Sequence, residues 1–163
     1  MREMRDIVRW WLAAGIDPKE HIIFAQSSVP ETCELTWLLN CFAPVGDLER
    51  MPHWTEKSVQ GANAGLLTYP VLMAADILGP GANIVPVGED QLPHVEFARE
   101  LAGRVNRALG EELFPVPESI EQSLRVPGLK GSGKMGKSEP KGTINLDDSS
   151  VRFARRCERR LLY

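Results

Sequence analysis

The chain has 163 residues, of which 43% are hydrophobic and 25% are charged, and its formal net charge is −3. This length is typical of one domain, and the apolar content is enough for a hydrophobic core. The small negative charge argues against wholesale nucleic-acid binding, and the apolar runs are too short to cross a membrane.

The predicted elements alternate between helices and a few strands, which is typical of an α/β fold. Residues 1–14 form an amphipathic helix with Ile7, Val8, Trp11 and Leu12 on one side. A strand is expected after it, followed by a helix and then a connecting stretch over residues 44–66 that holds a short helix near residues 47–51. We treat residues 1–163 as one domain, with residues 149–163 beginning a C-terminal helical region.

Residues 68–78 predict a largely apolar helix that contains a single carboxylate, Asp76. Burying an ionised carboxylate is costly unless a donor meets it. Tyr69, Met73 and Asp76 stand at i, i+4 and i+7, so they share one helix face. That face offers an apolar wall with an acceptor at its end, which suits a ligand ring with one N–H or O–H. A neighbouring backbone group or arginine could satisfy Asp76 instead.

A short strand is predicted over residues 83–87, and it ends in Gly88 before a long helical pattern. Ligands of open α/β sheets bind where a strand's carboxyl end meets the next helix. Gly88 allows close approach, while Asp90 and Gln91 can bind ribose hydroxyls or an ammonium group. The structural alternative is a helix N-cap at Asp90 with Pro93 in the first turn, and it is compatible with binding.

Residues 131–138, Gly-Ser-Gly-Lys-Met-Gly-Lys-Ser, formally match the phosphate loop of nucleotide hydrolases. The flanking sequence argues against that interpretation, because Pro127 disfavours the strand before it and Pro140 the helix after it. The interpretation that remains is a glycine-rich loop that presents Lys134 and Lys137 to a polyphosphate. The alternative is an ordinary solvated basic loop.

Together these segments resemble a class I aminoacyl-tRNA synthetase, and closely the tryptophanyl family. Residues 134–138 resemble the family's Lys-Met-Ser-Lys-Ser loop, with glycine in place of the middle serine, and residues 88–91, Gly-Glu-Asp-Gln, resemble its ribose and amino-acid signature. Residues 69–78 are similar to the helix that reads the indole ring. The resemblance extends from about residue 5 to residue 148, so we expect a partial Rossmann-like nucleotide-binding domain with parallel strands.

The resemblance implies activation of tryptophan by ATP, which enters with magnesium, followed by acyl transfer to tRNA in a homodimer. Asp76 would accept the indole N–H, Met73 would pack on the ring, and Tyr69 and Gln91 would hold the ammonium. The resemblance implies catalytic roles for Lys134 and Lys137. The ATP contacts that it implies are made by Gly88, Asp90, Lys134, Met135, Lys137 and Ser138. No metal site of the protein's own is implied.

The family's early strand and the His-x-Gly-His turn after it have no counterpart before Ile22. The missing turn leads us to expect poor stand-alone activity, and the missing strand marginal stability or self-association. A non-catalytic relative that binds tryptophan, nucleotide or a protein partner is therefore the alternative function. The arginines at residues 152, 155, 156, 159 and 160 share a helix face that could touch tRNA or simply face solvent. Three cysteines without metal spacing indicate a reducing, cytoplasmic location, and three histidines isolated in sequence predict no metal site.

Overall fold

The computed structural model describes residues 2–57, 61–121, 129, 135, 143–145 and 148–151. The chain divides into two compact units, residues 1–121 and residues 122–163. In the second unit, Thr143 is buried, and Asp148 accepts a hydrogen bond from the Asn145 N–H at 3.0 Å. The first unit holds the elements that position the site.

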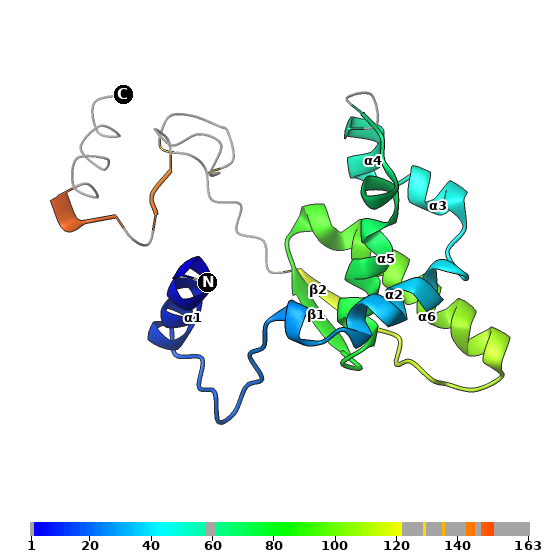
Figure 1. Ribbon diagram of the computed structural model, residues 1–163, viewed down its shortest axis with the longest axis horizontal. Coiled ribbons are helices and arrows are strands. Elements are labelled where there is room, and N and C mark those ends of the chain that lie inside the picture. The colour runs from blue at the N-terminus through cyan, green and yellow to red at the C-terminus, as the bar shows by residue number, and fades with distance from the viewer. Residues whose placement is uncertain are drawn as a thin grey trace. The chain divides into compact units, whose positions relative to one another are not determined.

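The first unit is built mainly of helices around a short parallel sheet (Figure 1). Its elements in chain order are α1 (Arg2–Ala13), η1 (Gln26–Ser28), α2 (Glu31–Asn40), α3 (Val45–Glu49), α4 (Pro52–Lys57), α5 (Ala64–Leu78), β1 (Ile84–Val87), η3 (Glu89–Gln91), α6 (Leu92–Leu109) and β2 (Glu118–Glu121). The expected N-terminal helix, the helix before the connecting stretch, the short helix near residues 47–51, the Asp76 helix, the strand and the long helix are therefore confirmed, and α4 is an additional helix that was not predicted.

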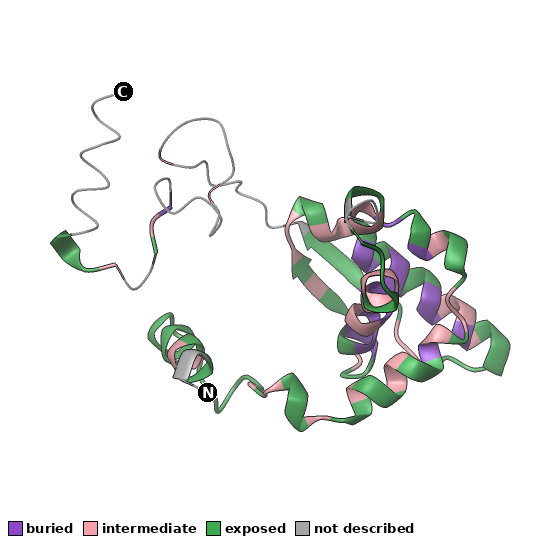
Figure 2. Cartoon of the chain, turned by 45° about the horizontal axis from the view of Figure 1, so that its top comes forward, coloured by how far each residue is buried: buried purple, intermediate pink, exposed green. Residues whose placement is uncertain are grey.

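The hydrophobic core lies where α5 packs against α2 and α6. Figure 2 shows the buried residues gathered along these helices. Alanines on the facing surfaces, Ala74 of α5 and Ala98 and Ala102 of α6, are fully buried, and their small side chains let the helix backbones approach closely. Larger residues complete the core: Leu39, Leu48, Met51, Val71, Ile77, Leu78, Val95, Phe97, Leu101 and Val105.

Both ends of α5 are defined by local hydrogen bonds. Its N-cap, Asn63, accepts the Leu66 N–H at 2.9 Å. At the other end the Ala82 N–H bonds the Ile77 carbonyl and the Gly81 N–H bonds the Leu78 carbonyl, both at 3.1 Å. This is a Schellman motif, in which Gly81 takes a left-handed φ of 70°. The motif accounts for Gly81, whereas at Gly79 a Cβ would lie 2.8 Å from the Ala75 carbonyl oxygen.

The sheet consists of β1 and β2, which pair in parallel with Ile84 opposite Glu118 and Val87 opposite Glu121. Among the described residues of this unit, β1 pairs with β2 alone. The strand β2 was not predicted, and the strand expected between α1 and α2 does not form. Residues 22–25 are irregular, and Ile22 is 92% exposed. Among the described residues, no strand pairs with this segment to supply the hydrogen bonds that a strand requires.

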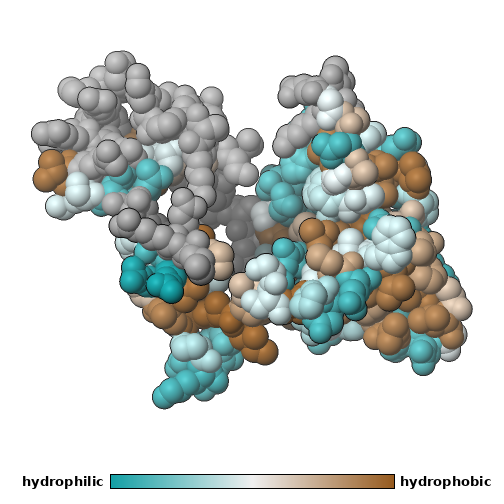
Figure 3. Space-filling view, viewed as in Figure 1, coloured by the Kyte–Doolittle hydropathy of each residue, from teal (hydrophilic) through white to brown (hydrophobic). Residues whose placement is uncertain are grey.

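The amphipathic pattern expected for residues 1–14 forms α1, and its apolar residues remain accessible. Ile7, Trp11 and Leu12 are all exposed, and Figure 3 shows the resulting hydrophobic surface on this helix. Within the described ranges, no helix is long and apolar enough to span a membrane.

Replacing Leu101 with alanine should lower the free energy of unfolding by about 2–5 kcal/mol, because it removes a fully buried side chain and leaves a cavity. The matched control is Leu109→Ala on the same helix, where the side chain is 52% exposed. That change should cost less than about 0.5 kcal/mol. Urea unfolding followed by circular dichroism measures both, and equal losses would contradict the placement of the core.

Candidate functional site

One face of α5 is left open by its neighbours, and it carries the three residues that the sequence placed together. Val71, Ala74 and Leu78 turn into the core, whereas Tyr69 and Met73 are half-buried. Asp76, seven residues after Tyr69 on the same face, is exposed. The expectation of a buried carboxylate was therefore wrong. Asp76 is exposed although its neighbours Ala75 and Ile77 are buried, and His94 of α6 reaches the same face at Tyr69.

A side chain from another element holds Asp76. The Gln26 amide Nε2 donates to both carboxylate oxygens, at 2.8 and 2.9 Å. Sequence reasoning missed Gln26, although it lies in a stretch that contributed to the family resemblance. A carboxylate offers about four acceptor positions. One amide group therefore orients Asp76 and leaves it able to accept a hydrogen from a ligand.

The carboxyl end of β1 leads directly into Gly88 and the one-turn helix η3. Gly88 has extended backbone, and a Cβ at this position would lie 3.0 Å from Asp90 Oδ1. Crowding by Asp90, rather than an unusual φ, therefore favours glycine here. Gln91 Nε2 donates to Asp90 Oδ2 at 3.0 Å. The alternative with Asp90 as N-cap was wrong, because Gln91 occupies the α6 N-cap and makes no side-chain capping bond.

Two histidines that are far apart in sequence meet at the Tyr69 hydroxyl. The Tyr69 oxygen lies 2.6 Å from His53 Nδ1 on α4 and 2.6 Å from His94 Nε2 on α6. We call these three residues the imidazole–phenol cluster. Isolation in sequence therefore did not mean isolation in space. The described residues nevertheless contain no group of three or more potential metal ligands.

Burial changes the acid–base properties of this cluster. Burial lowers the pKa of His94, and His53 lowers it further, while the charge of Asp90 acts in the opposite direction. Burial also raises the pKa of Tyr69, as does the negative charge of Glu56. The environment therefore favours an uncharged phenol beside an uncharged imidazole.

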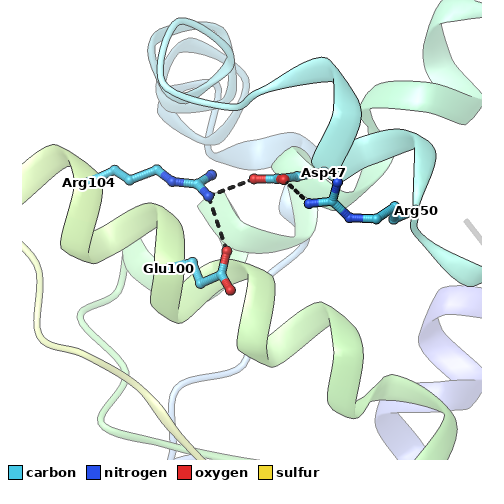
Figure 4. A network of polar contacts seen from close by, with 4 residues as sticks. All are labelled: Asp47, Arg50, Glu100 and Arg104. Carbon is cyan, nitrogen blue, oxygen red and sulfur yellow. Dashed lines mark hydrogen bonds and ion pairs between the residues drawn. The ribbon is translucent and has the colours of Figure 1, made fainter.

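An ionic network ties the connecting stretch to α6 (Figure 4). Arg104 Nη2 of α6 lies 2.6 Å from Asp47 Oδ2 of α3 and 3.1 Å from Glu100 Oε2. Arg50, at the end of α3, also pairs with Asp47. Because α4 follows α3 immediately, this network helps to place His53 opposite His94.

The other predicted site residues are placed less fully. Lys134, Lys137, Ser138 and the five C-terminal arginines lie outside the described residues, and Met135 is half-buried without regular secondary structure. Cys33 and Cys41 are exposed free thiols.

Stability should fall as the pH is lowered below about 6.5, the ordinary pKa of histidine. The pKa of His94 is lower in the folded protein, so the unfolded state binds a proton first and is favoured by acid. Above that pH both states are neutral at this residue, and the effect disappears. Urea unfolding between about pH 7.5 and 5 should show this slope in the wild type and a shallower slope in His94→Gln. His21→Gln, at an exposed histidine, serves as the control, and equal slopes in all three proteins would refute the prediction.

Comparison with known proteins identifies the family. The family model described as tRNA synthetases class I (W and Y) matches residues 1–156. A tryptophan–tRNA ligase from Porphyromonas gingivalis is 48% identical over 157 residues, which cover 93% of this chain and 48% of that protein. A second, from Deinococcus radiodurans, is 50% identical over 131 residues, which cover 78% and 39%. The chain thus spans less than half the length of these curated relatives.

Solved structures agree with these matches. Tryptophanyl-tRNA synthetase from Campylobacter jejuni, complexed with ADP and tryptophan, has a TM-score of 0.78 and 43% identity, covering 90% of this chain and 46% of that one. The enzyme from Mycoplasma pneumoniae has a TM-score of 0.83 and 35% identity, covering 93% and 46%. The resemblance inferred from the motifs is therefore confirmed, and the chain belongs to the class I tRNA synthetases of the tryptophan and tyrosine type.

Proposed function

We propose that this chain carries the tryptophan- and ATP-binding part of a tryptophan–tRNA ligase. The observation that supports this most directly is the open face of α5. It presents an aromatic hydroxyl, a thioether and an accessible carboxylate in a row, while Val71, Ala74, Ala75, Ile77 and Leu78 of the same helix are buried.

The amino acid would lie along this face. Asp76, oriented by Gln26, accepts the indole N–H, which can only donate a hydrogen bond. Met73 packs on the ring, since a polarizable thioether suits an aromatic surface. Tyr69 and Gln91 hold the ammonium group. A tyrosine hydroxyl could also donate to Asp76, so the preference for tryptophan is supported mainly by the relatives' names.

ATP would bind beyond the end of β1. Gly88 and Asp90 contact the ribose, and the loop residues Lys134, Met135, Lys137 and Ser138 contact the phosphates. The tryptophan carboxylate attacks the α-phosphorus of ATP and forms the aminoacyl-adenylate. The bond between the α-phosphorus and the oxygen that bridges to the β-phosphate breaks, and pyrophosphate leaves. The protein contributes mainly positioning and stabilisation of charge on the leaving group, with the two lysines beside it. Magnesium enters with ATP.

The second half-reaction would transfer the tryptophanyl group from the adenylate to tRNA. The relatives' names support tRNA as the acceptor. Arginines at residues 152, 155, 156, 159 and 160 are candidates for contact with its phosphates. We also propose a homodimer and a cytoplasmic location, on the strength of the family resemblance and of the reducing compartment indicated by the cysteines.

Replacing Asp76 with asparagine should weaken tryptophan binding about tenfold, because a hydrogen bond to a charged acceptor contributes roughly 1.5 kcal/mol or more. The change keeps the size of the side chain and removes its charge. Isothermal titration calorimetry measures the affinity. Asp6→Asn, at a helical carboxylate on α1 that pairs with Arg9, is the control and should bind normally. Unchanged binding in Asp76→Asn would remove this residue from the site.

Adenylate formation is tested by exchange of labelled pyrophosphate into ATP, which should require both tryptophan and magnesium. Lys137→Ala should slow this exchange by about a hundredfold, as expected when a charge-stabilising group is lost, and leave tryptophan affinity unchanged. Tryptophan binding without any exchange would instead indicate a non-catalytic relative. Magnesium-dependent ATP hydrolysis without an amino acid would indicate a nucleotide hydrolase.

A further inference from the structure

The imidazole–phenol cluster joins three helices at one oxygen atom. His53 comes from α4, Tyr69 from α5 and His94 from α6. Their ring centroids lie 5.5–5.8 Å apart, so the rings are mutually packed as well as hydrogen-bonded. In the proposed function Tyr69 faces the ammonium group of tryptophan. The arrangement of hydrogens in this cluster therefore bears on ligand recognition.

The phenol has one hydrogen to donate and two lone pairs to accept with. Ring nitrogens of both histidines lie at 2.6 Å from its oxygen, and the single hydroxyl hydrogen can satisfy only one of them. The other nitrogen must then carry a hydrogen and donate it to the phenol oxygen. Three arrangements are possible when both rings are neutral. In two of them one histidine donates and the other accepts. In the third both donate, and the hydroxyl hydrogen then has no acceptor among the described residues, which disfavours it.

The surroundings of His94 distinguish the first two arrangements. Its side chain is 1% exposed, and its second ring nitrogen, Nδ1, has no hydrogen-bond partner among the described residues. If Nε2 accepted the phenol hydrogen, a neutral His94 would carry its own hydrogen on Nδ1 as a buried donor without an acceptor. Such orphaned donors are rarer than under-satisfied acceptors. The favoured arrangement therefore has His94 Nε2–H donating to Tyr69, and Tyr69 O–H donating to His53 Nδ1.

We propose that His53 and His94 are positioning residues that keep the Tyr69 oxygen as a hydrogen-bond acceptor for the ammonium group of the amino acid. This inference rests on the proposed function. In the favoured arrangement the hydroxyl hydrogen is committed to His53 and one lone pair to His94, which leaves one lone pair free. An ammonium group can only donate hydrogen bonds, so this free lone pair is what it requires.

A proton added to the cluster would reverse the role of Tyr69. Both imidazoles would then donate to the phenol oxygen and occupy both lone pairs, so the hydroxyl hydrogen would turn toward the ligand. A second positive charge would also lie close to the ammonium. Two carboxylates on neighbouring elements act on the cluster, Glu56 of α4 on Tyr69 and Asp90 of η3 on His94. Affinity for an ammonium-bearing ligand should therefore fall when the cluster gains a proton, and the range in which histidines generally change charge, about pH 8 to 5, is the range to test.

Calorimetry on the full chain across this pH range tests the proposal with two ligands, L-tryptophan and 3-indolepropionate, which lacks the ammonium. Tryptophan affinity should fall about tenfold or more toward acid, equivalent to roughly 1.4 kcal/mol, whereas indolepropionate affinity should stay level. Equal pH dependence of the two ligands would overturn the proposal. The variant Glu56→Gln tests whether that carboxylate causes the pH dependence. The loss of tryptophan affinity at low pH should persist in this variant, and its disappearance would contradict the role of His53.

Variants of His53 separate positioning from a merely structural role. His53→Asn puts an amide oxygen near the position of Nδ1, so it should keep tryptophan affinity within about threefold at pH 8 and flatten the pH profile. His53→Leu releases the phenol hydrogen and should weaken tryptophan binding at every pH, with little effect on indolepropionate. His21→Asn is the matched control, because His21 Nδ1 contacts only the Asp17 carbonyl. An unflattened profile in His53→Asn would count against the proposal.

The hydrogen positions can be read without any ligand. Long-range ¹H–¹⁵N NMR correlations at pH 8 should show His94 protonated on Nε2 and His53 accepting at Nδ1. A His94 hydrogen on Nδ1 would overturn the inference whether or not tryptophan binds. The expected tautomers together with no binding of tryptophan would instead overturn the proposed function, and the hydrogen arrangement would stand.

Discussion

The close packing of α5 between α2 and α6 is the constraint on which the rest of the first unit depends. Buried alanines at the contact bring the helix axes together, so the covered side of α5 has little room for rearrangement. The uncovered side is thereby fixed in orientation. Tyr69, Met73 and Asp76 point the same way because the core holds the opposite face, and the candidate site inherits its rigidity from packing that lies outside it.

Polar contacts then attach the neighbouring segments to this helical frame. Gln26 joins the segment before α2 to Asp76, and the Asp47–Arg104 ion pair joins α3 to α6. His53 and His94 reach Tyr69 from either side. Each of these contacts links different elements, and those of Gln26, His53 and His94 end on α5 itself. The polar groups thus determine the details of a surface whose position the apolar core has already determined.

Periodicity in the sequence was sufficient to predict α5, the strand at residues 84–87, the long helix and the shared face of Tyr69 and Asp76, because these depend on local spacing. Burial of Asp76 was predicted wrongly, since it depends on which sides of α5 other helices cover. The strand Glu118–Glu121 was missed because only Ile120 in it is strongly apolar. The contacts of Tyr69 with the two histidines could not be foreseen from spacing, since they arise where three separate helices converge.

The exposure of Asp76 has a consequence for selectivity. An acceptor that water already reaches exchanges one hydrogen bond for another when a ligand N–H arrives, so the bond itself contributes a modest net free energy. Discrimination between an indole and a plain hydrocarbon ring then depends on how completely the incoming molecule dehydrates the carboxylate. A ring that leaves water beside Asp76 would gain little from the hydrogen bond. A ring that displaces this water but has no N–H or O–H would leave a dehydrated carboxylate without a donor, and this cost disfavours it relative to an indole.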